Sequence, residues 1–230
     1  MREGRKNNEL REIRFTKDFT KNAMGSVLVE FGNTKVITTA SVDFSKPKWM
    51  DKEDNRGWVT AEYSLLPSST STRCKRERTS VSGRTQEIQR LIGRSLRACV
   101  DMTKMPDVTI IVDADVIQAD GGTRTASICG GYLALSIAIE KLLKDGVLKE
   151  NPIIEPIAAI SAGIVDGDVR LDLDYSEDST AQADSNVVLT KSGKVIEFQT
   201  TSEGEPYDKE KLFEIFEVAK KGIDEIISMY

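Results

Sequence analysis

The fold is decided by a short stretch in the middle of the chain, Gln118-Ala-Asp-Gly-Gly-Thr-Arg-Thr-Ala-Ser-Ile128. The β-branched run Val108–Val116 before it predicts a strand, and the apolar segment behind it predicts a helix from about Thr125 to Lys144. We therefore interpret the residues from Gln118 to Arg124 as the turn that joins the two. Two adjacent glycines at its centre allow the backbone a tight path into the helix.

This junction has the properties of an anion-binding site. The first amides of a helix have no acceptor within the helix, and the helix dipole favours negative charge near them. We expect the amides of Gly122, Thr123 and Arg124 to be available there, together with the Thr123 hydroxyl and the Arg124 guanidinium. The alternative is an ordinary helix start at which the arginine is incidental.

A second arginine occupies an equivalent position, because Arg84 lies in Ser82-Gly-Arg-Thr85, where a polar loop meets a predicted helix. Two arginines at helix starts can hold one small oxyanion such as phosphate from two sides. Neither segment is followed by the Gly-Lys-Ser/Thr of a nucleotide-binding P-loop. The sequence therefore indicates free phosphate or an RNA phosphate as the ligand, and not a nucleoside triphosphate.

Further strands and helices are predicted upstream of this junction. Gly25–Phe31 and Lys35–Val42 predict a hairpin, and Trp58–Tyr63 predicts a third strand. A helix is expected to begin near Thr85, because apolar residues recur along one stripe at helical spacing: Ile88, Leu91, Ile92, Leu96 and Cys99.

The second half of the chain repeats this order of strands followed by a helix. Ile157–Val165 with Val169–Leu173, and Asn186–Thr190 with Val195–Thr200, predict two hairpins. The amphipathic segment Lys209–Ile227 predicts a closing helix.

These two series of elements predict an α+β fold built from a duplicated β/α unit. We interpret residues 1–230 as a single domain with two pseudo-repeated halves, at about 1–146 and 157–230. The duplication rests on the order of the elements, because the sequences of the two halves have little in common.

The residue types that are missing restrict the chemistry. The chain of 230 residues has no histidine, which excludes histidine-dependent triads, histidine-ligated metals and histidine acid–base catalysis. Its three cysteines lack the spacing of a metal site and favour a reducing compartment. No run approaches the ~18 consecutive apolar residues of a membrane span, and the charged N-terminus has no apolar signal segment, so we expect a cytoplasmic protein with no membrane partner.

Charge is distributed unevenly along the chain. The net charge is −5, but residues 73–97 contain eight basic and two acidic side chains, which gives this segment a charge of +6. A basic segment on an acidic protein is typical of a site for a polyanion. A solvated helix face beside a charged loop is the alternative.

Five acidic residues gather in or beside one predicted loop of the second half: Asp172, Asp174, Glu177, Asp178 and Asp184. Without histidine, a pair of these carboxylates is the candidate for acid–base catalysis or for binding Mg²⁺. Asp178 and Asp184 lie in the irregular stretch between two predicted strands, where a site can form. The alternative is a solvated acidic loop with no chemical role.

Four runs of the sequence resemble the RNase PH family of bacterial exoribonucleases, and the middle two are long and specific. They are Trp58-Val-Thr-Ala-Glu-Tyr63, Glu87-Ile-Gln-Arg-Leu-Ile-Gly-Arg-Ser-Leu-Arg97, Gln118-Ala-Asp-Gly-Gly-Thr-Arg-Thr-Ala-Ser127 and Glu203-Gly-Glu-Pro206. The resemblance extends over nearly the whole chain, from Gly4-Arg5 to the closing helix.

The resemblance implies a phosphate-dependent 3′→5′ exoribonuclease. Such an enzyme trims RNA tails, including the 3′ ends of tRNA precursors, uses inorganic phosphate as co-substrate and releases nucleoside diphosphates in a reversible reaction. The resemblance also implies the RNase PH-like fold, which is that of ribosomal protein S5 domain 2, and a homohexamer arranged as a trimer of dimers.

The matching motifs assign expected roles to eight residues. They imply phosphate binding by Arg84, Gly122, Thr123 and Arg124, catalysis and Mg²⁺ binding by Asp178 and Asp184, and RNA contacts by Arg73 and Arg76. Asp184 is our candidate for the general acid, with Asp178 holding or orienting the metal ion. One departure is Ser68, since the family commonly has arginine directly after the Leu-Pro of this loop, and the loop before Gly83 is slightly short. Both departures imply weaker RNA binding by this loop.

Two other functions fit these residues less well. A non-catalytic RNA-binding ring subunit, as in exosome-like assemblies, would be expected to lack the phosphate arginines or the acidic pair, whereas this chain has Arg84, Arg124, Asp178 and Asp184. A hydrolytic nuclease would use water in place of phosphate, and the predicted anion site argues against it.

Overall fold

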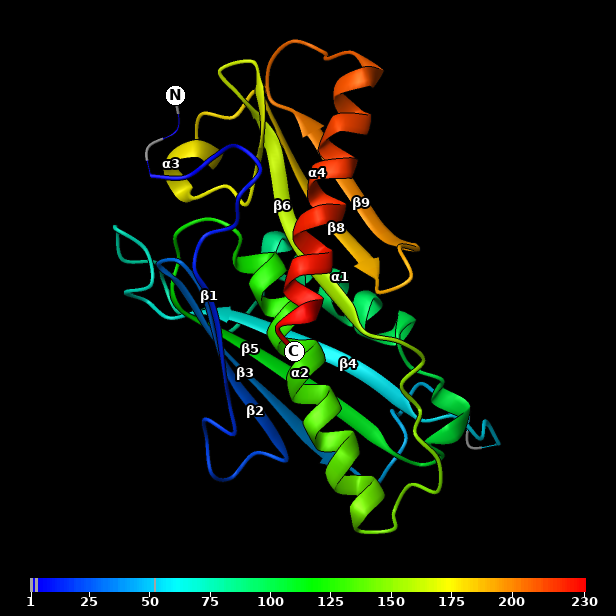
Figure 1. Ribbon diagram of the computed structural model, residues 1–230. Coiled ribbons are helices and arrows are strands. Elements are labelled where there is room, and N and C mark those ends of the chain that lie inside the picture. Colours follow the sequence, from blue (N-terminus) through cyan, green and yellow to red (C-terminus); the bar gives the residue numbers. More distant parts are fainter. Residues whose placement is uncertain (1, 3, 52) are drawn as a thin grey trace.

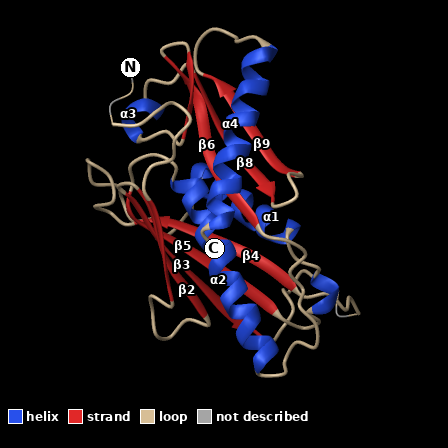
Figure 2. Ribbon diagram, in the orientation of Figure 1, coloured by secondary structure: helices blue, strands red, loops and turns tan. Residues whose placement is uncertain are grey.

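Each half of the chain forms one β-sheet, and the two sheets lie at opposite ends of the molecule with helices between and against them (Figures 1 and 2). The computed structural model describes residue 2 and residues 4–51 and 53–230. Figure 1 shows the sheet of the first half below the sheet of the second half, while the N-terminal segment reaches up beside α3 (Tyr175–Asp178). The predicted α+β class is confirmed.

The first sheet has five strands in the order β1-β2-β3-β5-β4. They are β1 (Ile13–Lys17), β2 (Gly25–Phe31), β3 (Thr34–Asp43), β4 (Trp58–Leu65) and β5 (Thr109–Gln118). Neighbouring strands run antiparallel except for β4 and β5, which are parallel. A parallel pair needs a crossover, and α1 (Gly83–Ala98) with the 3₁₀ turn Met102–Lys104 provides it.

The long helix α2 (Thr123–Lys144) lies between the two sheets and contacts β2, β3 and β6. Its approach to β2 depends on small residues. A Cβ added at Gly130 would lie 2.2 Å from Cγ2 of Val29, so a larger side chain there would force the helix and sheet apart. By length and composition α2 could span a membrane, but most of it is buried inside the protein, as expected of a core helix.

The second sheet is antiparallel, with the strand order β7-β6-β8-β9. Its strands are β6 (Ile157–Val165), β7 (Asp168–Leu171), β8 (Ala183–Thr190) and β9 (Val195–Ser202), and α4 (Lys209–Ser228) covers one face. Every residue of β6 is buried, because α4 packs on one side of this strand and α2 on the other. The β6–β7 turn has positive φ at both Asp166 and Gly167, as expected of an Asp-Gly hairpin.

The elements predicted from periodicity are present, with shifted ends. The predicted apolar stripe of α1 is buried at all five positions, and the helix begins two residues earlier than expected, at Gly83. Gln118 ends β5 and Thr123 begins α2, so the turn between them is shorter than the sequence indicated. Three short elements were not predicted: β1, the 3₁₀ turn and α3 (Tyr175–Asp178).

Candidate active site

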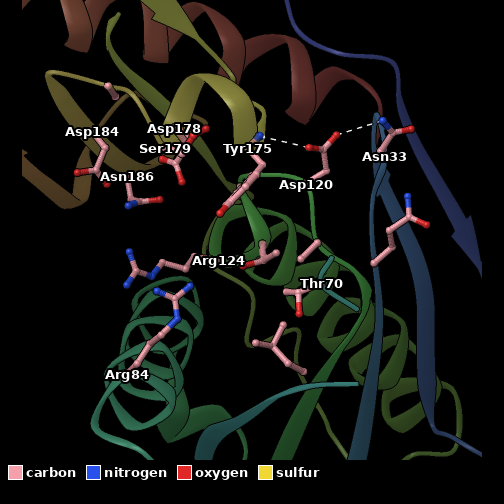
Figure 3. A pocket seen from close by; sticks show the side chains of 18 of the residues that line it. Asn33, Thr70, Arg84, Asp120, Arg124, Tyr175, Asp178, Ser179, Asp184 and Asn186 are labelled. Atoms are coloured by element: carbon pink, nitrogen blue, oxygen red, sulfur yellow. Dashed lines mark hydrogen bonds between the residues drawn. The ribbon is translucent and has the colours of Figure 1, made fainter. Parts of the chain in front are cut away.

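A cavity of about 1090 Å³ opens between the two halves of the chain, beside the first turns of α1 and α2. Six of the eight residues expected from the sequence line it: Arg84, Gly122, Thr123, Arg124, Asp178 and Asp184. Figure 3 shows the two arginines on one side of the cavity and the two aspartates on the other. The fold therefore joins the predicted anion site to the predicted acidic pair.

The other two expected residues, Arg73 and Arg76, lie outside the cavity wall. Both are exposed on the loop that connects β4 to α1. Their neighbours Thr72 and Cys74 do line the cavity, so this basic loop forms part of its rim. RNA contact by Arg73 and Arg76 stays a prediction.

Arg84 is the second residue of α1, so its side chain extends from the first turn of the helix. The helix is capped by Ser82, whose hydroxyl oxygen accepts a hydrogen bond of 3.2 Å from the Thr85 amide. The exposed Arg84 side chain extends towards the aspartates in Figure 3. A cation held at a capped helix start adds to the positive end of the helix dipole.

The turn between β5 and α2 requires its glycines. Gly121 and Gly122 have φ of 72° and 67°, and a Cβ at Gly121 would lie 2.4 Å from the carbonyl oxygen of Leu173. The hydroxyl of Thr34 fixes this turn, because it donates to the carbonyl of Gly121 (2.6 Å) and accepts from the amide of Asp120 (2.9 Å). The first amides of α2 are therefore held in one place at the cavity wall.

Thr123 is oriented by a tyrosine from the neighbouring sheet. The buried Tyr63 donates its hydroxyl proton to Oγ1 of Thr123 at 3.0 Å. Burial raises the pKa of Tyr63, so this hydroxyl keeps its proton. Since the Thr123 oxygen accepts from Tyr63, its own proton is free to be donated to an anion in the cavity.

Arg124 is held by Glu87 of α1, whose Oε2 accepts a hydrogen bond of 2.8 Å from an Nη of the arginine. The Nε of Arg124 is buried and has no hydrogen-bond partner among the residues that the structure describes. Buried donors are rarely left unpaired in proteins. An anion beside the start of α2 would satisfy this donor.

The two aspartates belong to regular elements and not to the irregular stretch that the sequence indicated. Asp178 ends the short helix α3, and Asp184 is the second residue of β8. Burial raises the pKa of both carboxyls; the neighbouring Asp184 adds to the rise at Asp178, and Glu203 adds to the rise at Asp184. A carboxyl that holds its proton more firmly than usual is suited to act as a general acid.

Asp172 and Glu177 are not part of a solvated acidic loop. Both are buried and bind an arginine cluster of Arg2, Arg5, Arg11 and Arg170, which we call the arginine clamp. Arg11 holds both carboxylate oxygens of Asp172, at 3.0 and 2.7 Å. Arg2 and Arg170 hold Glu177, at 2.7 and 3.2 Å.

The arginine clamp also fixes two backbone segments that carry residues of the cavity wall. Arg11 also donates to the backbone carbonyls of Asp120 and Gly121, in the turn that leads into α2. Glu177 precedes Asp178 directly, so the clamp fixes α3 as well. Asp174 caps α3, because its carboxylate accepts a hydrogen bond of 3.1 Å from the Glu177 amide.

Sequence reasoning missed four groups at this site: Tyr63, Glu87, Tyr175 and Asn186. Tyr63 and Glu87 stand at the edge of the matched runs, but their roles depend on contacts with α2 that no local pattern reveals. Asn186 lines the cavity two residues after Asp184 on the same strand, and alternation along β8 was a usable signal for it.

Asp178 and Asp184 are the type and number of protein ligands that the expected Mg²⁺ commonly takes. The described residues contain no cluster of three or more His, Cys, Asp or Glu that could hold a metal ion by themselves. Mg²⁺ commonly binds through one or two carboxylates and completes its shell with phosphate oxygens and waters. Asp178 and Asp184 line the same cavity and provide such a pair.

The family model and the most similar known proteins place the chain in the same family. The model of the 3′ exoribonuclease family matches in two parts, its domain 1 at residues 9–139 and its domain 2 at residues 155–222. The chain is 55% identical over 229 residues to ribonuclease PH of Neisseria gonorrhoeae, which covers 99% of this chain and 94% of the relative. It is 54% identical over 220 residues to ribonuclease PH of Neisseria meningitidis serogroup B, covering 95% and 90%.

Solved structures with the same fold are more distant in sequence. Rice Rrp46 superposes with a TM-score of 0.79 at 20% identity, covering 98% of this chain and 95% of that one. The Archaeoglobus fulgidus exosome with RNA bound to the active site gives a TM-score of 0.80 at 19% identity, covering 98% and 90%. These likenesses confirm the predicted RNase PH-like fold.

Proposed function

The chain belongs to the 3′ exoribonuclease family and is a phosphate-dependent 3′→5′ exoribonuclease, and we propose that the cavity between its two halves carries out this reaction. The observation that supports this location is the pairing of two cations with two carboxyls across one cavity. Arg84 and Arg124 lie on one side and Asp178 and Asp184 on the other (Figure 3).

Inorganic phosphate is held at the start of α2. The first amides of the helix, the Thr123 hydroxyl and the unpaired Nε of Arg124 are donors, and Arg84 approaches from the start of α1. Charge-assisted hydrogen bonds from two guanidinium groups neutralise the anion and fix its orientation.

Phosphorolysis exchanges one bond to phosphorus for another. A phosphate oxygen attacks the phosphorus of the last phosphodiester, in line with the departing 3′ oxygen of the preceding nucleotide. The new P–O bond makes the terminal nucleotide a nucleoside diphosphate, and the released 3′ oxygen takes up a proton to become the 3′-hydroxyl of the shortened RNA. Positioning and charge neutralisation supply most of the catalysis, as in other phosphoryl transfers.

We assign the proton donor to Asp184 and the orienting role to Asp178. The raised pKa of Asp184 favours the protonated carboxyl that a general acid needs. Bound Mg²⁺ would be held by Asp178, and by Asp184 once that carboxyl has given up its proton, and would neutralise charge that develops on the phosphate oxygens. Asp178 is well placed to orient the reacting groups, because the arginine clamp fixes the residue before it.

The RNA substrate enters from the basic rim, where Arg73 and Arg76 contact its backbone. Their positions on an exposed loop next to the cavity suit phosphate contacts that carry no sequence information. We further propose that the substrates include the 3′ ends of tRNA precursors, that the protein is cytoplasmic, and that it assembles as a homohexamer, a trimer of dimers.

The deciding experiment supplies a single-stranded 3′ tail with and without inorganic phosphate and identifies the released nucleotides. We expect nucleoside diphosphates that appear only with phosphate. Nucleoside monophosphates released without phosphate would instead establish hydrolysis. No product under either condition would favour the non-catalytic RNA-binding subunit.

A further inference from the structure

One aromatic side chain in the cavity has no role in the reaction described above. Tyr175 begins α3, the same short helix that ends at Asp178, and 62% of its side chain is exposed. It lines the cavity, and Figure 3 shows its ring projecting into the open space between the aspartates and Thr70. Exposed rings occur elsewhere on this chain, as at Phe213, but a ring left open inside a cavity is available for a ligand to pack on.

The backbone that carries this ring is held from both halves of the molecule. The amide of Tyr175 donates to Oδ1 of Asp120 at 3.3 Å, and Oδ2 of the same carboxylate accepts from Nδ2 of Asn33 at 3.1 Å (Figure 3). The Asp174 cap and the arginine clamp fix the rest of α3. A ring on a fixed backbone loses little conformational entropy when a ligand packs on it.

The ring also has no competing partner. Its hydroxyl forms no hydrogen bond to any residue that the structure describes, and it is the only aromatic side chain in the described cavity wall. The remaining wall is mostly polar side chains and turn backbone, which recognise phosphate and sugar better than the flat face of a base. Any base next to the reacting phosphodiester therefore has one ring on which it can stack.

We propose that Tyr175 is a stacking platform for a nucleobase at the RNA 3′ end, one of the two bases that flank the reacting phosphodiester. This inference rests on the proposed location of the reaction, because Tyr175 and Asp178 belong to the same helical turn. Stacking on an aromatic ring tolerates all four bases, since each has a π face. Such a platform would position the RNA end for repeated removal of nucleotides without restricting its sequence.

The test compares Tyr175→Ala and Tyr175→Phe on a short single-stranded oligonucleotide at saturating phosphate. Loss of a base–aromatic stack is expected to raise KM for RNA roughly 5- to 150-fold in the alanine variant, while phenylalanine, which keeps the ring, stays near wild type. The KM for phosphate should change little in both. Phe213→Ala is the matched control, because Phe213 is a 63% exposed ring of the second half that lies outside the cavity.

Abasic substrates identify the partner of the ring. An oligonucleotide without the terminal base, and another without the penultimate base, are assayed with wild type and Tyr175→Ala. If the platform is correct, one of the two deletions costs wild type the same factor as the alanine substitution, and the two losses do not add. Additive losses with both substrates would overturn the proposal.

Three further outcomes would also overturn it. Unchanged kinetics in Tyr175→Ala, with a wild type that releases diphosphates normally, would refute the platform but not the reaction. Light scattering that shows a changed assembly only in Tyr175→Ala would place the ring in a subunit contact. A wild type that gives no phosphate-dependent product would refute the proposed reaction site, and this inference with it.

Discussion

Removing the Arg11 side chain should strongly destabilise the protein, because it leaves a fully buried carboxylate without its main partner. Arg11 and Asp172 have exposed side-chain fractions of 8% and 0%, and two guanidinium nitrogens contact both carboxylate oxygens. Breaking a buried ion pair by removing one partner costs about 3–5 kcal/mol. For a chain of this size, that loss corresponds to a fall in Tm of roughly 6–20 °C.

The assay is thermal unfolding of Arg11→Ala beside the control Arg14→Ala. Arg14 pairs with Glu12 at the surface, where the two side chains are 66% and 79% exposed, and such a pair contributes less than about 1 kcal/mol. The KM for phosphate should rise only in Arg11→Ala, because Arg11 also supports the carbonyls of the turn before α2. Equal falls in Tm for the two variants would refute the structural role of the arginine clamp.

Four further predictions concern the reaction. Arg124→Ala removes a charge-assisted contact of about 1.5–3 kcal/mol, so a phosphate titration should show KM raised roughly 10- to 150-fold with RNA binding largely kept; an unchanged phosphate requirement would place the anion elsewhere. Arg73→Ala combined with Arg76→Ala should weaken binding of structured RNA more than turnover of a short oligonucleotide, and the difference should fade with added salt; equal losses would mean that the loop shapes the reaction site. Asp184→Asn should nearly abolish turnover in assembled protein. Burial raises the pKa of the Asp184 carboxyl, so its ionised form opposes folding at neutral pH, and Asp184→Asn should have a higher Tm than wild type at pH 7. This difference in Tm should disappear below about pH 3.9, where the carboxyl is protonated in both the folded and the unfolded wild type. A lower Tm of the variant at pH 7 would contradict the raised pKa. Excess nucleoside diphosphate with Mg²⁺ and little phosphate should lengthen a labelled oligonucleotide, since the phosphoanhydride keeps much of the bond energy; shortening with phosphate but no lengthening with any diphosphate would argue against phosphorolysis.

The positions of the arginines expected to bind an anion were predictable because their determinants are local. Arg84 and Arg124 each follow a turn and precede an apolar stripe of helical period, so their positions at helix starts could be inferred from neighbouring residues. The paired glycines before Thr123 indicated a tight turn, and positive φ at both confirms the reason for them. The meeting of the two helix starts at one cavity, proposed from chemistry, agrees with the structure.

The missed features depend on contacts between residues far apart in the chain. The burial of Asp172 could not be predicted, because its partner Arg11 belongs to the N-terminal segment and an acidic loop looks solvated by itself. The short helix α3 has only four residues, too few for a periodic signal, and it is held by a cap and by the arginine clamp. The edge strand β1 has a partly exposed, charged sequence that resembles a loop.

The arginine clamp also determines when, during synthesis, the enzyme can become active. Arg11 precedes Asp172 by 161 residues, and Arg2 precedes Glu177 by 175. At about 5–20 residues added per second, these arginines are made roughly 8–35 s before their partners. Until then the turn proposed to bind phosphate lacks its support and the helix that carries Asp178 does not exist. We therefore expect that a translation product that stops short of Asp172 cannot degrade RNA, and that nuclease activity appears only when the second half of the chain folds against the first.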